Sequence, residues 1–448
     1  MREQLISKNG PGKPDRTLAS AWKWLVPGIG VKRWLVLLFS GITFLALGVA
    51  YVLVDFYREQ AVPPVFYYMT LQFLPRLARA ALVGVVGVGA VVWALVQISR
   101  SLLAPFVRPG SEPVVETVYR HRQRERGPKV VAIGGGTGLS MLLRGLKEFT
   151  SNITAIVTVA DDGGSSGRLR RELGVLPPGD LRNCIAALAD SEAMTTQLFQ
   201  YRFNAGQGLE GHSFGNLFIV AMAAVTGSFE SALVESSRVL AVQGRIVPST
   251  LQDVTLMADL REEAPGQVSR VAGQSSITKM GGSIERVYLQ PDDVRPYPEA
   301  IRAILDADLI ILGPGSLYTS IMPNLLVRDI AEAVRSSRAL KVYVCNVATQ
   351  HGETDHYSAA DHVTAIERHA GPGLVNVLLA NGWLDMDFRT AGVPSGVGEL
   401  VLPSGSQSSR LVTADLIDVE HPWRHDSRKL AQAVWDVYAQ SGGRVAAS

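Results

Sequence analysis

Two long runs without a charged residue constrain this chain more than any other feature. They cover residues 34–54, a run of 21, and residues 80–99, a run of 20. A helix of about 20 apolar residues crosses the hydrocarbon core of a bilayer, so the pair predicts a two-helix transmembrane hairpin over residues 34–99. A cleaved signal peptide fits poorly, because a polar segment of 33 residues precedes the first run. Two buried core helices are the alternative, although soluble domains seldom place two such stretches in tandem.

The distribution of lysine and arginine orients this hairpin. Seven of these residues precede the first run and seven follow the second up to Lys129, whereas the loop between the runs contains Arg58, Arg76 and Arg79. The positive-inside rule therefore predicts a multi-pass membrane protein with both termini in the cytoplasm. The basic stretch at residues 119–129 favours contact with anionic lipid head groups over a solvated linker. The expected segments are a cytoplasmic N-terminus (1–33), the hairpin (34–99), a basic juxtamembrane linker (100–126) and a large cytoplasmic domain (127–448).

From Gly127 onward, short apolar runs alternate with helical stretches. Five runs read as buried strands, at residues 129–133, 153–159, 309–312, 341–345 and 375–379. Six stretches read as helices, at residues 139–149, 181–189, 214–225, 298–306, 325–336 and 428–438. This repetition is typical of an α/β domain, and it predicts a Rossmann-like parallel sheet with helices on both faces. Cys184 and Cys345 have no cysteine neighbour at metal-ligand spacing, so we expect neither a disulfide framework nor a zinc site.

Glycine and polar residues follow the ends of four predicted strands. The sequence GGGTG at 134–138 leads from a strand into a helix, and GPGS at 313–316 follows another strand. Glycines permit close backbone approach, and a helix N-terminus offers free N–H groups to a phosphate. Asp161 and Asp162 could take ribose hydroxyls or a divalent cation, or form a solvated Asp-Gly turn. Ligands in such folds bind beyond the carboxyl ends of the strands, so together the four loops favour a binding site over simple turns.

Several other interpretations have weaker support in the sequence. The third glycine of a dinucleotide-binding fingerprint would fall on Leu139, so an NAD-dependent oxidoreductase ranks last. Asp180 by itself reads as a structural N-cap, and a lone His212 is more often structural than catalytic. No Ser-His-Asp or Cys-His arrangement can be argued from spacing, so no catalytic residue is assigned.

Six motifs carry a family resemblance. They are GGGTG at 134–138, ADDGGSSGRLR at 160–170, PPGDLRNC at 177–184, GHSFGNL at 211–217, LGPGSLYTS at 312–320 and RHD at 424–426. With them, residues 127–438 resemble the YvcK-type gluconeogenesis factors of the CofD-like superfamily. The resemblance implies a Rossmann-like domain that binds a UDP-sugar such as UDP-N-acetylglucosamine. It also implies a role in growth on gluconeogenic carbon sources, in cell shape and in cell-wall synthesis.

The resemblance and the strand-end positions together predict one ligand-binding set. The guanidinium of Arg424 suits a diphosphate. Two positions differ from the family pattern: His351 replaces the proline of the motif TQPGET, and Phe388 falls where relatives often have tyrosine. The predicted set is Gly134, Gly135, Gly136, Thr137, Gly138, Asp161, Asp162, Ser165, Asn183, His212, Asn216, Gly313, Gly315, Ser316, Tyr318, Thr319, Asn324, Asn346, Gln350, Phe388 and Arg424.

Two functions of different classes stay open. The first is a UDP-sugar-responsive regulator that acts on cell-wall synthesis proteins at the membrane, with a homodimer as an option and no nucleic-acid partner. The second is a CofD-like transferase, which moves a phospho-acyl group from a nucleotide diphosphate carrier to an acceptor. A transferase usually needs a metal to neutralise the diphosphate, and Asp161 and Asp162 could hold Mg²⁺. The GGSSGRLR and RHD segments follow the YvcK pattern, which favours the regulator.

Overall fold

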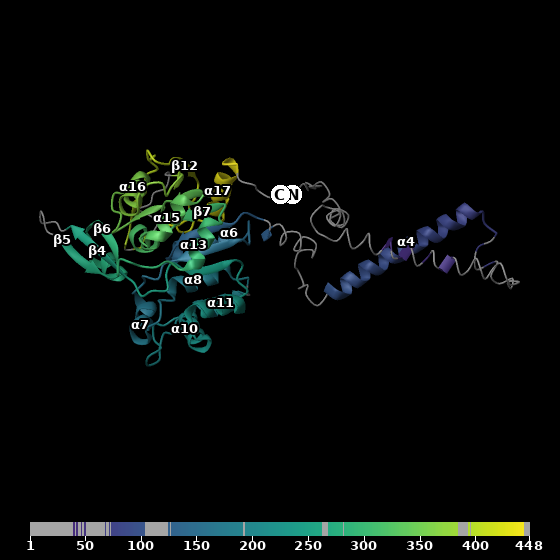
Figure 1. Cartoon of the computed structure of the whole chain (residues 1–448), viewed down its shortest axis with the longest axis horizontal. Coiled ribbons are helices and arrows are strands. Elements are labelled where there is room, and N and C mark those ends of the chain that lie inside the picture. Colours follow the sequence, from purple (N-terminus) through teal and green to yellow (C-terminus); the bar gives the residue numbers. More distant parts are fainter. Residues whose placement is uncertain are drawn as a thin grey trace, which may run out of the picture. The chain divides into compact units, whose positions relative to one another are not determined.

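The computed structural model describes residues 76–103, 124–125, 127–190, 193–261, 268–280, 282–383, 393–394 and 396–442, together with scattered positions between 39 and 75. Contacts along the chain divide it into two compact units, Met1–Arg122 and Gln123–Ser448. Figure 1 shows the helices and strands of both units. The division falls within the segment predicted as a linker, close to the predicted start of the large domain at Gly127.

The first unit contains the long helix α4 (Arg76–Leu103), which covers the second of the two uncharged runs. Many of its described apolar side chains are exposed, among them Leu82, Val85, Val88 and Trp93. Counted over the described residues, no helix combines the length and the hydropathy that a membrane span needs. Most of the first uncharged run, at residues 34–54, lies outside the described residues.

The second unit is built on a seven-stranded sheet in which every pairing is parallel. The inner strand β1 is buried at all five positions, as expected for a parallel strand that is covered on both faces. The strand order is β12-β10-β8-β7-β1-β2-β3. The strands are β1 (Val130–Gly134), β2 (Ile153–Val157), β3 (Arg245–Pro248), β7 (Leu309–Leu312), β8 (Leu340–Val344), β10 (Val377–Asn381) and β12 (Arg410–Ala414).

Helices cover both faces of this sheet. From β1 the chain passes through a helix to β2 on one side, and from β7 through a helix to β8 on the other, so right-handed crossovers place these two helices on opposite faces. The first face carries α6 (Gly136–Leu146), which packs against α8 (Gly179–Leu188) and α17 (Ser427–Gln440). The second face carries α13 (Pro298–Leu305), α14 (Met322–Leu325), α15 (Arg328–Ser336) and α16 (Ala359–Ala370).

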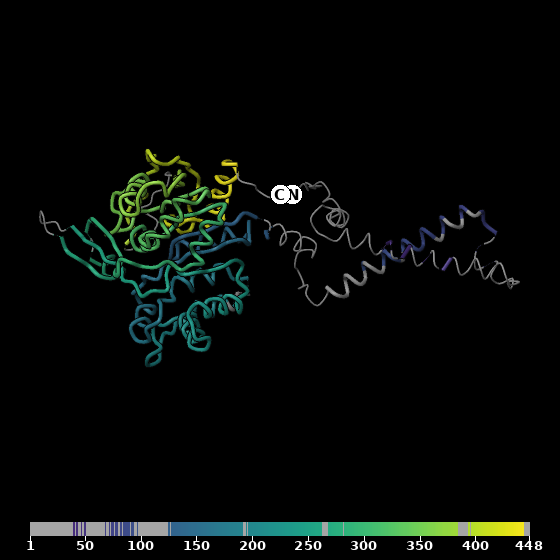
Figure 2. The backbone as a smooth tube through the Cα atoms, viewed as in Figure 1, coloured from purple at the N-terminus to yellow at the C-terminus, as the bar shows by residue number. Residues whose placement is uncertain are grey.

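Two further parts complete this unit, and the backbone can be followed through both in Figure 2. A helical lobe comprises α7 (Gly164–Leu173), α9 (Ala193–Gln200), α10 (Phe214–Thr226) and α11 (Phe229–Val239). A three-stranded antiparallel sheet, with β4 at its centre, projects away from the parallel sheet (Figure 1). It contains β4 (Thr255–Arg261), β5 (Val268–Ala272) and β6 (Ser283–Gln290), and α12 (Gln274–Met280) follows β5. A small antiparallel pair is formed by β9 (Ala348–Gln350) and β11 (Val397–Leu400).

The α/β prediction is confirmed for this unit. All five predicted strands and all six predicted helices are present, with ends that differ by a few residues. The largest difference among the strands is at β10, which begins two residues later than expected at Val377. The sequence pattern did not predict the projecting antiparallel sheet.

Candidate functional site

The strand order identifies the place where a ligand would bind. Strands β1 and β7 are neighbours, but the chain continues from β1 towards β2 and from β7 in the opposite direction towards β8. In open α/β sheets, such a switch point opens a crevice beyond the carboxyl ends of the two strands. A cavity of about 590 Å³ lies there. Its wall includes residues 135–138 after β1, 314–316 after β7, 346–350 after β8, and 423–425.

Glycines in the loop after β1 allow three segments to meet at the base of this cavity. Gly136 has a φ of +65°, the left-handed region that favours glycine. A Cβ atom on Gly135 would lie 2.5 Å from Oδ2 of Asp180, and one on Gly138 would lie 2.6 Å from the carbonyl oxygen of Pro314. Since these contacts are too short for any side chain, the loop brings the first turn of α6 against the loop after β7. The N–H groups of that turn have no acceptor within the helix, so they can bind an anion.

The loop after β7 is held by two asparagine side chains. Asn346 accepts a hydrogen bond from the N–H of Gly315 (3.2 Å) and donates one to its carbonyl oxygen (2.9 Å). Asn324 is fully buried and donates to the carbonyl oxygens of Gly134 (3.0 Å) and Ser320 (2.8 Å). It therefore ties the end of β1 to the π-helix η2 (Leu317–Ile321), which begins directly after the cavity-lining Ser316.

The three carboxyl groups after β2 and at the start of α8 have different partners. Asp162 accepts hydrogen bonds from the N–H (2.9 Å) and hydroxyl (2.8 Å) of Ser275 in α12, so it anchors the projecting sheet. Asp161 accepts from the N–H of Gly163 at 2.9 Å. Burial, with the neighbouring carboxylate of Asp161, raises the pKa of Asp180 to about 7. Its Oδ2 is buried without a hydrogen-bond partner.

A second buried carboxyl group lies behind the loop after β7. Glu353 is 5% exposed, and burial raises its pKa to about 7. It accepts hydrogen bonds from the hydroxyls of Thr319 (3.2 Å) and of Thr278 (3.1 Å). Because Thr278 belongs to α12 and Thr319 to η2, this carboxyl group joins the projecting sheet to the loop that lines the cavity.

The predicted residues Ser165, His212 and Asn216 form a small buried cluster. Nδ2 of Asn216 donates to Oγ of Ser165 at 3.0 Å, and Nδ1 of His212 lies 2.9 Å from the same oxygen. Since burial lowers the pKa of His212, its ring is neutral and Nδ1 accepts a hydrogen bond from the hydroxyl of Ser165. None of the three lines the cavity, so the cluster holds the start of α7 against the start of α10.

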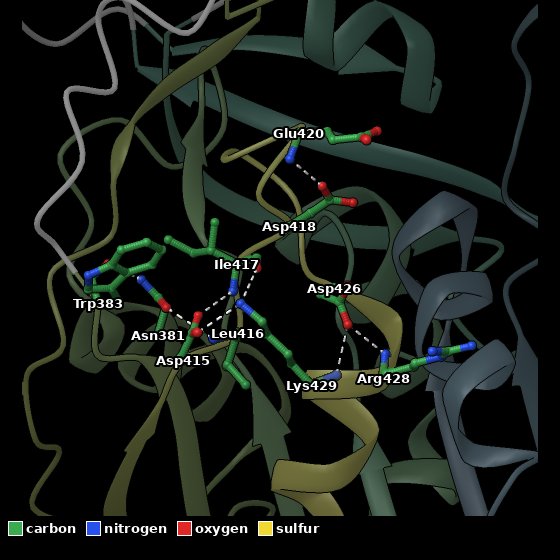
Figure 3. Close-up of polar contacts among 10 residues, drawn as sticks. All are labelled: Asn381, Trp383, Asp415, Leu416, Ile417, Asp418, Glu420, Asp426, Arg428 and Lys429. Carbon is green, nitrogen blue, oxygen red and sulfur yellow. Dashed lines mark hydrogen bonds and ion pairs between the residues drawn. The ribbon is translucent and has the colours of Figure 1, made fainter. Parts of the chain in front are cut away.

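A loop between β12 and α17 brings Trp423, Arg424 and His425 to the cavity. Figure 3 shows how its two ends are held. Nζ of Lys429 donates to Oδ2 of Asp415 (2.7 Å) and to the carbonyl oxygen of Ile417 (3.0 Å), while Asp426 caps the N-terminus of α17. Nε2 of His425 bonds to the carbonyl oxygen of Cys345 at 3.1 Å. Burial lowers the pKa of His425 to about 4, so the neutral ring donates this bond and fixes the loop to the end of β8.

Comparison with known proteins places the chain in a family. The family model for 2-phospho-L-lactate transferase CofD matches residues 130–441. A protein from Halalkalibacterium halodurans named gluconeogenesis factor is 47% identical over 310 residues, which are 68% of this chain and 95% of that protein. The chain belongs to the gluconeogenesis factor family of CofD-domain proteins. The predicted family is thereby confirmed.

Other members of the family extend the comparison. The gluconeogenesis factor of Bacillus subtilis is 55% identical over 254 residues, which are 57% of this chain and 78% of that protein. A crystal structure of a UPF0052 family member from Bacillus halodurans is 44% identical, with a TM-score of 0.64. It covers 69% of this chain and 99% of the crystallised chain.

The structure of this family member gathers about half of the predicted ligand-binding set around one cavity. Gly134 ends β1, Gly313 follows β7 with a φ of +80°, and Phe388 lies outside the described residues. Eight predicted residues do not line the cavity: Asp161, Asp162, Ser165, His212, Asn216, Tyr318, Thr319 and Asn324. The ten that do are Gly135, Gly136, Thr137, Gly138, Asn183, Gly315, Ser316, Asn346, Gln350 and Arg424.

Tyr318 illustrates the difference between a motif position and a cavity position. Its side chain is fully buried, and its hydroxyl bonds to that of Tyr357 at 2.9 Å. Its side chain therefore holds η2, to which it belongs, against Tyr357. Sequence reasoning also missed several cavity residues, notably Arg144, Gln274 and Trp423. Trp423 adjoins the RHD motif and could have been suspected, whereas Gln274 begins α12, which follows a strand of a sheet that the sequence pattern did not predict.

The two adjacent aspartates each have a hydrogen-bond partner within the protein. Asp162 is bonded to Ser275 and Asp161 to the backbone of its own turn. Within the described part of the chain, no group of three or more histidine, cysteine, aspartate or glutamate side chains is arranged to hold a metal ion. The role of Mg²⁺ remains a prediction.

Proposed function

We propose that this family member is a regulatory protein that binds a UDP-sugar, such as UDP-N-acetylglucosamine, in the cavity at the switch point. The observation that carries the proposal is the pairing of two glycine-containing loops, after β1 and after β7, in the wall of one cavity of about 590 Å³. Each loop leads into a helix N-terminus, and helix N-termini bind phosphate groups. The volume is within the range of small-molecule sites.

Two arginines suit the same ligand. Arg144 of α6 and Arg424 both line the cavity. A guanidinium group binds diphosphate oxygens through two parallel hydrogen bonds. The cavity thus combines backbone N–H groups with two permanent positive charges, which is the chemistry that recognises a diphosphate.

The GGSSGRLR and RHD segments follow the pattern of the gluconeogenesis factors, which favours a regulatory role over a transferase role. The CofD family model nevertheless keeps a phospho-acyl transferase as the second candidate.

Titration calorimetry with UDP-N-acetylglucosamine, with and without Mg²⁺, tests both functions. We expect binding without Mg²⁺ and an intact ligand after prolonged incubation. Binding that requires Mg²⁺ and ends in a cleaved diphosphate would favour the transferase, and an absence of binding would refute the UDP-sugar proposal.

Arg424→Ala provides the corresponding variant. We expect it to weaken binding roughly tenfold or more, since charge-assisted hydrogen bonds contribute about 1.5–3 kcal/mol each. Arg302→Ala is the matched control, because Arg302 is paired with Glu299 beside the amino ends of the strands, at the opposite edge of the sheet. Equal affinities for both variants would remove Arg424 from the site.

We further propose that the protein acts at the cell membrane, with both predicted spans inserted and the second unit in the cytoplasm. The uncharged runs at 34–54 and 80–99, the surrounding lysines and arginines, and the exposed apolar side chains of α4 support this placement. A tethered UDP-sugar sensor would lie beside the enzymes of cell-wall synthesis, which are its proposed partners in linking gluconeogenic growth to cell shape.

A further inference from the structure

The cavity at the switch point extends along the carboxyl edge of the parallel sheet. At one end, Gln274 lines it beside the bond between α12 and the loop after β2. At the other end, Arg424 lines it beside the bond between the next residue and the end of β8. Strands β7 and β1 lie between β8 and β2, so the two ends are about 14 Å apart at about 4.8 Å per strand. The glycine loops after β1 and β7 therefore lie between the two ends.

The end towards β8 carries the positive charges of the cavity wall. Arg424 comes from the loop before α17, and Arg144 of α6 precedes Gly145, whose backbone packs directly against Ser427 at the start of α17. The described part of the cavity wall contains no other arginine and no lysine, aspartate or glutamate. The opposite end of the cavity, towards β2, is therefore without charge.

Three amide side chains line this uncharged end. They belong to Asn183 of α8, Gln200 at the end of α9 and Gln274 at the start of α12. All three residues are partly exposed, so their side chains are accessible to a ligand. An amide group offers both hydrogen-bond donors and an acceptor. The end towards β2 thus suits a neutral group with many hydroxyls, each of which donates and accepts.

Close backbone contacts hold two of these amides next to each other. A Cβ atom on Gly215 would lie 2.5 Å from the carbonyl oxygen of Phe199 and 2.9 Å from the side chain of Arg182. The residues that follow these two in the sequence are Gln200 and Asn183. Because both preceding residues meet at one glycine, the two amides enter the cavity from neighbouring helices.

The third amide is joined to the same region by the loop after β2. Ser275, next to Gln274, donates its N–H and its hydroxyl to Asp162. Oδ2 of the adjacent Asp161 would lie 3.1 Å from a Cβ atom on Gly179, the first residue of α8. The start of α12 therefore lies across the loop after β2 from the first turn of α8, which leads into the amide of that helix.

These amides keep hydrogen-bonding groups for a ligand. Oδ1 of Asn183 accepts from the guanidinium of Arg182 at 2.8 Å, which turns the NH₂ group of the amide away from that arginine. Within the described part of the chain, neither this NH₂ group nor the amide of Gln200 has a hydrogen-bond partner. A hydroxyl-bearing ligand can therefore bind without displacing a bond of the protein.

The nucleoside fits the other end of the cavity better. A flat base stacks on aromatic rings, and those of the described cavity wall, Trp423 and His425, both belong to the loop before α17. In dinucleotide folds an acidic residue about 20 residues after the glycine loop binds the ribose. Here Asp161 and Asp162 are bonded within the protein and do not line the cavity.

We propose that Asn183, Gln200 and Gln274 bind the sugar of the UDP-sugar through its hydroxyl and acetamido groups. The diphosphate then lies on the glycine loops, and the uridine lies towards β8. This inference rests on the proposed UDP-sugar function and adds the part of the cavity that recognises the sugar. A nucleotide sugar carries its base and its sugar on opposite sides of the diphosphate, which matches the uncharged and charged ends on opposite sides of the glycine loops.

Calorimetry on the full-length protein with UDP and with UDP-N-acetylglucosamine tests the assignment, because the two ligands differ only in the sugar. For the wild type we expect the sugar to strengthen binding at least about tenfold, since it adds several hydrogen bonds. Asn183→Ala and Gln200→Ala should each weaken binding of UDP-N-acetylglucosamine about three- to tenfold and change binding of UDP less than about twofold. The unchanged affinity for UDP also shows that the variants are folded.

Two further variants are controls. Gln197→Ala removes an exposed amide from the same helix as Gln200, three residues earlier, which does not line the cavity. We expect it to bind both ligands as the wild type does. Arg424→Ala should weaken binding of both ligands by the same factor, because both contain the diphosphate.

The outcomes separate this inference from the function on which it rests. If the wild type binds neither ligand, the proposed function fails and the inference fails with it. If the wild type binds UDP as tightly as UDP-N-acetylglucosamine, or if both amide variants bind the nucleotide sugar like Gln197→Ala, only the inference is overturned. Equal weakening of both ligands in Asn183→Ala and Gln200→Ala, at the melting temperature of the wild type, would place the uridine at this end and also overturn it.

Discussion

Two buried protein carboxyl groups lie beside the glycine loops that line this cavity. Asp180 lies against Gly135, where an added Cβ atom would be 2.5 Å from its Oδ2, and Glu353 accepts a hydrogen bond from the hydroxyl of Thr319 in η2. Burial raises the pKa of both groups to about 7. A protonated carboxyl group is neutral, so it can hold the loop in shape without repelling a neighbouring diphosphate as strongly as a carboxylate would. The sequence suggested Asp180 as an N-cap, but the N-cap of α8 is Pro178, and Asp180 lies in the first turn of the helix, against the loop after β1.

Asp180→Asn gives a pH-dependent prediction. An aspartate has a pKa of 3.8 when exposed, and burial beside Asp161 raises the pKa of Asp180 to about 7 in the folded protein. Between these values the unfolded chain has lost the proton while the folded chain keeps it. The free energy of unfolding therefore decreases as the pH rises from about 4 to about 7. Asparagine cannot ionise, so we expect the variant to gain on the order of 3 kcal/mol relative to the wild type between pH 4 and pH 8.

Denaturant unfolding at several pH values measures this difference. The exposed Asp292→Asn serves as the control and should follow the wild type across the range. A difference between Asp180→Asn and the wild type that stays constant from pH 4 to pH 8 would contradict the raised pKa.

Gly138→Ala tests the close approach of the loops after β1 and β7. The new Cβ atom would lie 2.6 Å from the backbone oxygen of Pro314, so the loops must separate. We expect a loss of about 1–3 kcal/mol in the free energy of unfolding, as for other overpacked sites, together with weaker UDP-sugar binding. Gly405→Ala is the control, since its Cβ atom would meet nothing within 4 Å. Equal stability and affinity for the two variants would mean that the contact is dispensable.

At the scale of elements, the loop between β12 and α17 depends on Lys429, which contacts both Asp415 and Ile417 (Figure 3). Lys429→Met keeps most of the side chain but removes these contacts, so Arg424 is held less firmly. We expect UDP-sugar affinity to fall about three- to tenfold in calorimetry, which corresponds to the loss of one or two hydrogen bonds. Lys129→Met, which breaks the exposed ion pair with Asp306, should leave affinity unchanged. An unaltered affinity in Lys429→Met would show that the loop holds its shape without the lysine.

The sequence allowed the parallel sheet to be predicted because its strands are continuous apolar runs. The strand at Leu309–Leu312 was predicted to the residue, since all four positions are buried and glycine follows directly. The projecting sheet was missed, because β5 exposes most of its side chains and so lacks that signal. Gln274 therefore could not be assigned to the cavity, and neither could the bond between Asp162 and Ser275 of the same helix.

The candidate site was predictable only where the motif residues themselves form the cavity wall. The glycines at 135, 136, 138 and 315 line it, because glycine is needed where two backbones approach. Asn324 and Tyr318 lie in equally distinctive motifs, but their side chains turn away and hold the loops from behind. A motif alone does not show whether a residue lines the cavity or supports a loop from behind, since segments distant in the sequence decide which side chains are buried.

At the scale of the whole molecule, relatives differ in how much of this chain they match. The crystallised relative from Bacillus halodurans is covered over 99% of its length by this chain and corresponds to little more than the second unit. A relative from Clostridium acetobutylicum is instead 41% identical over 424 residues, which cover 91% of this chain. Such a match is too long to be confined to residues 127–448, so that relative shares part of the segment that contains the uncharged runs. The second unit thus occurs with and without an N-terminal extension.

Removal of residues 1–122 tests the separate roles of the two units. The shortened protein should keep its UDP-sugar affinity and its melting temperature within about 2 °C, because it retains the whole core around the parallel sheet.

With anionic liposomes in a flotation gradient, the full-length protein should float and stay bound in 1 M salt, whereas the shortened protein should not float. Salt screens the attraction of the basic segment to lipid head groups, so resistance to salt reports insertion. Full-length protein with Leu82→Asp and Val86→Asp is the control, since each charge within a span costs about 2.5–3.5 kcal/mol. Flotation of this variant in 1 M salt, or a full-length wild type that stays at the bottom of the gradient, would contradict the membrane proposal while leaving the ligand site intact.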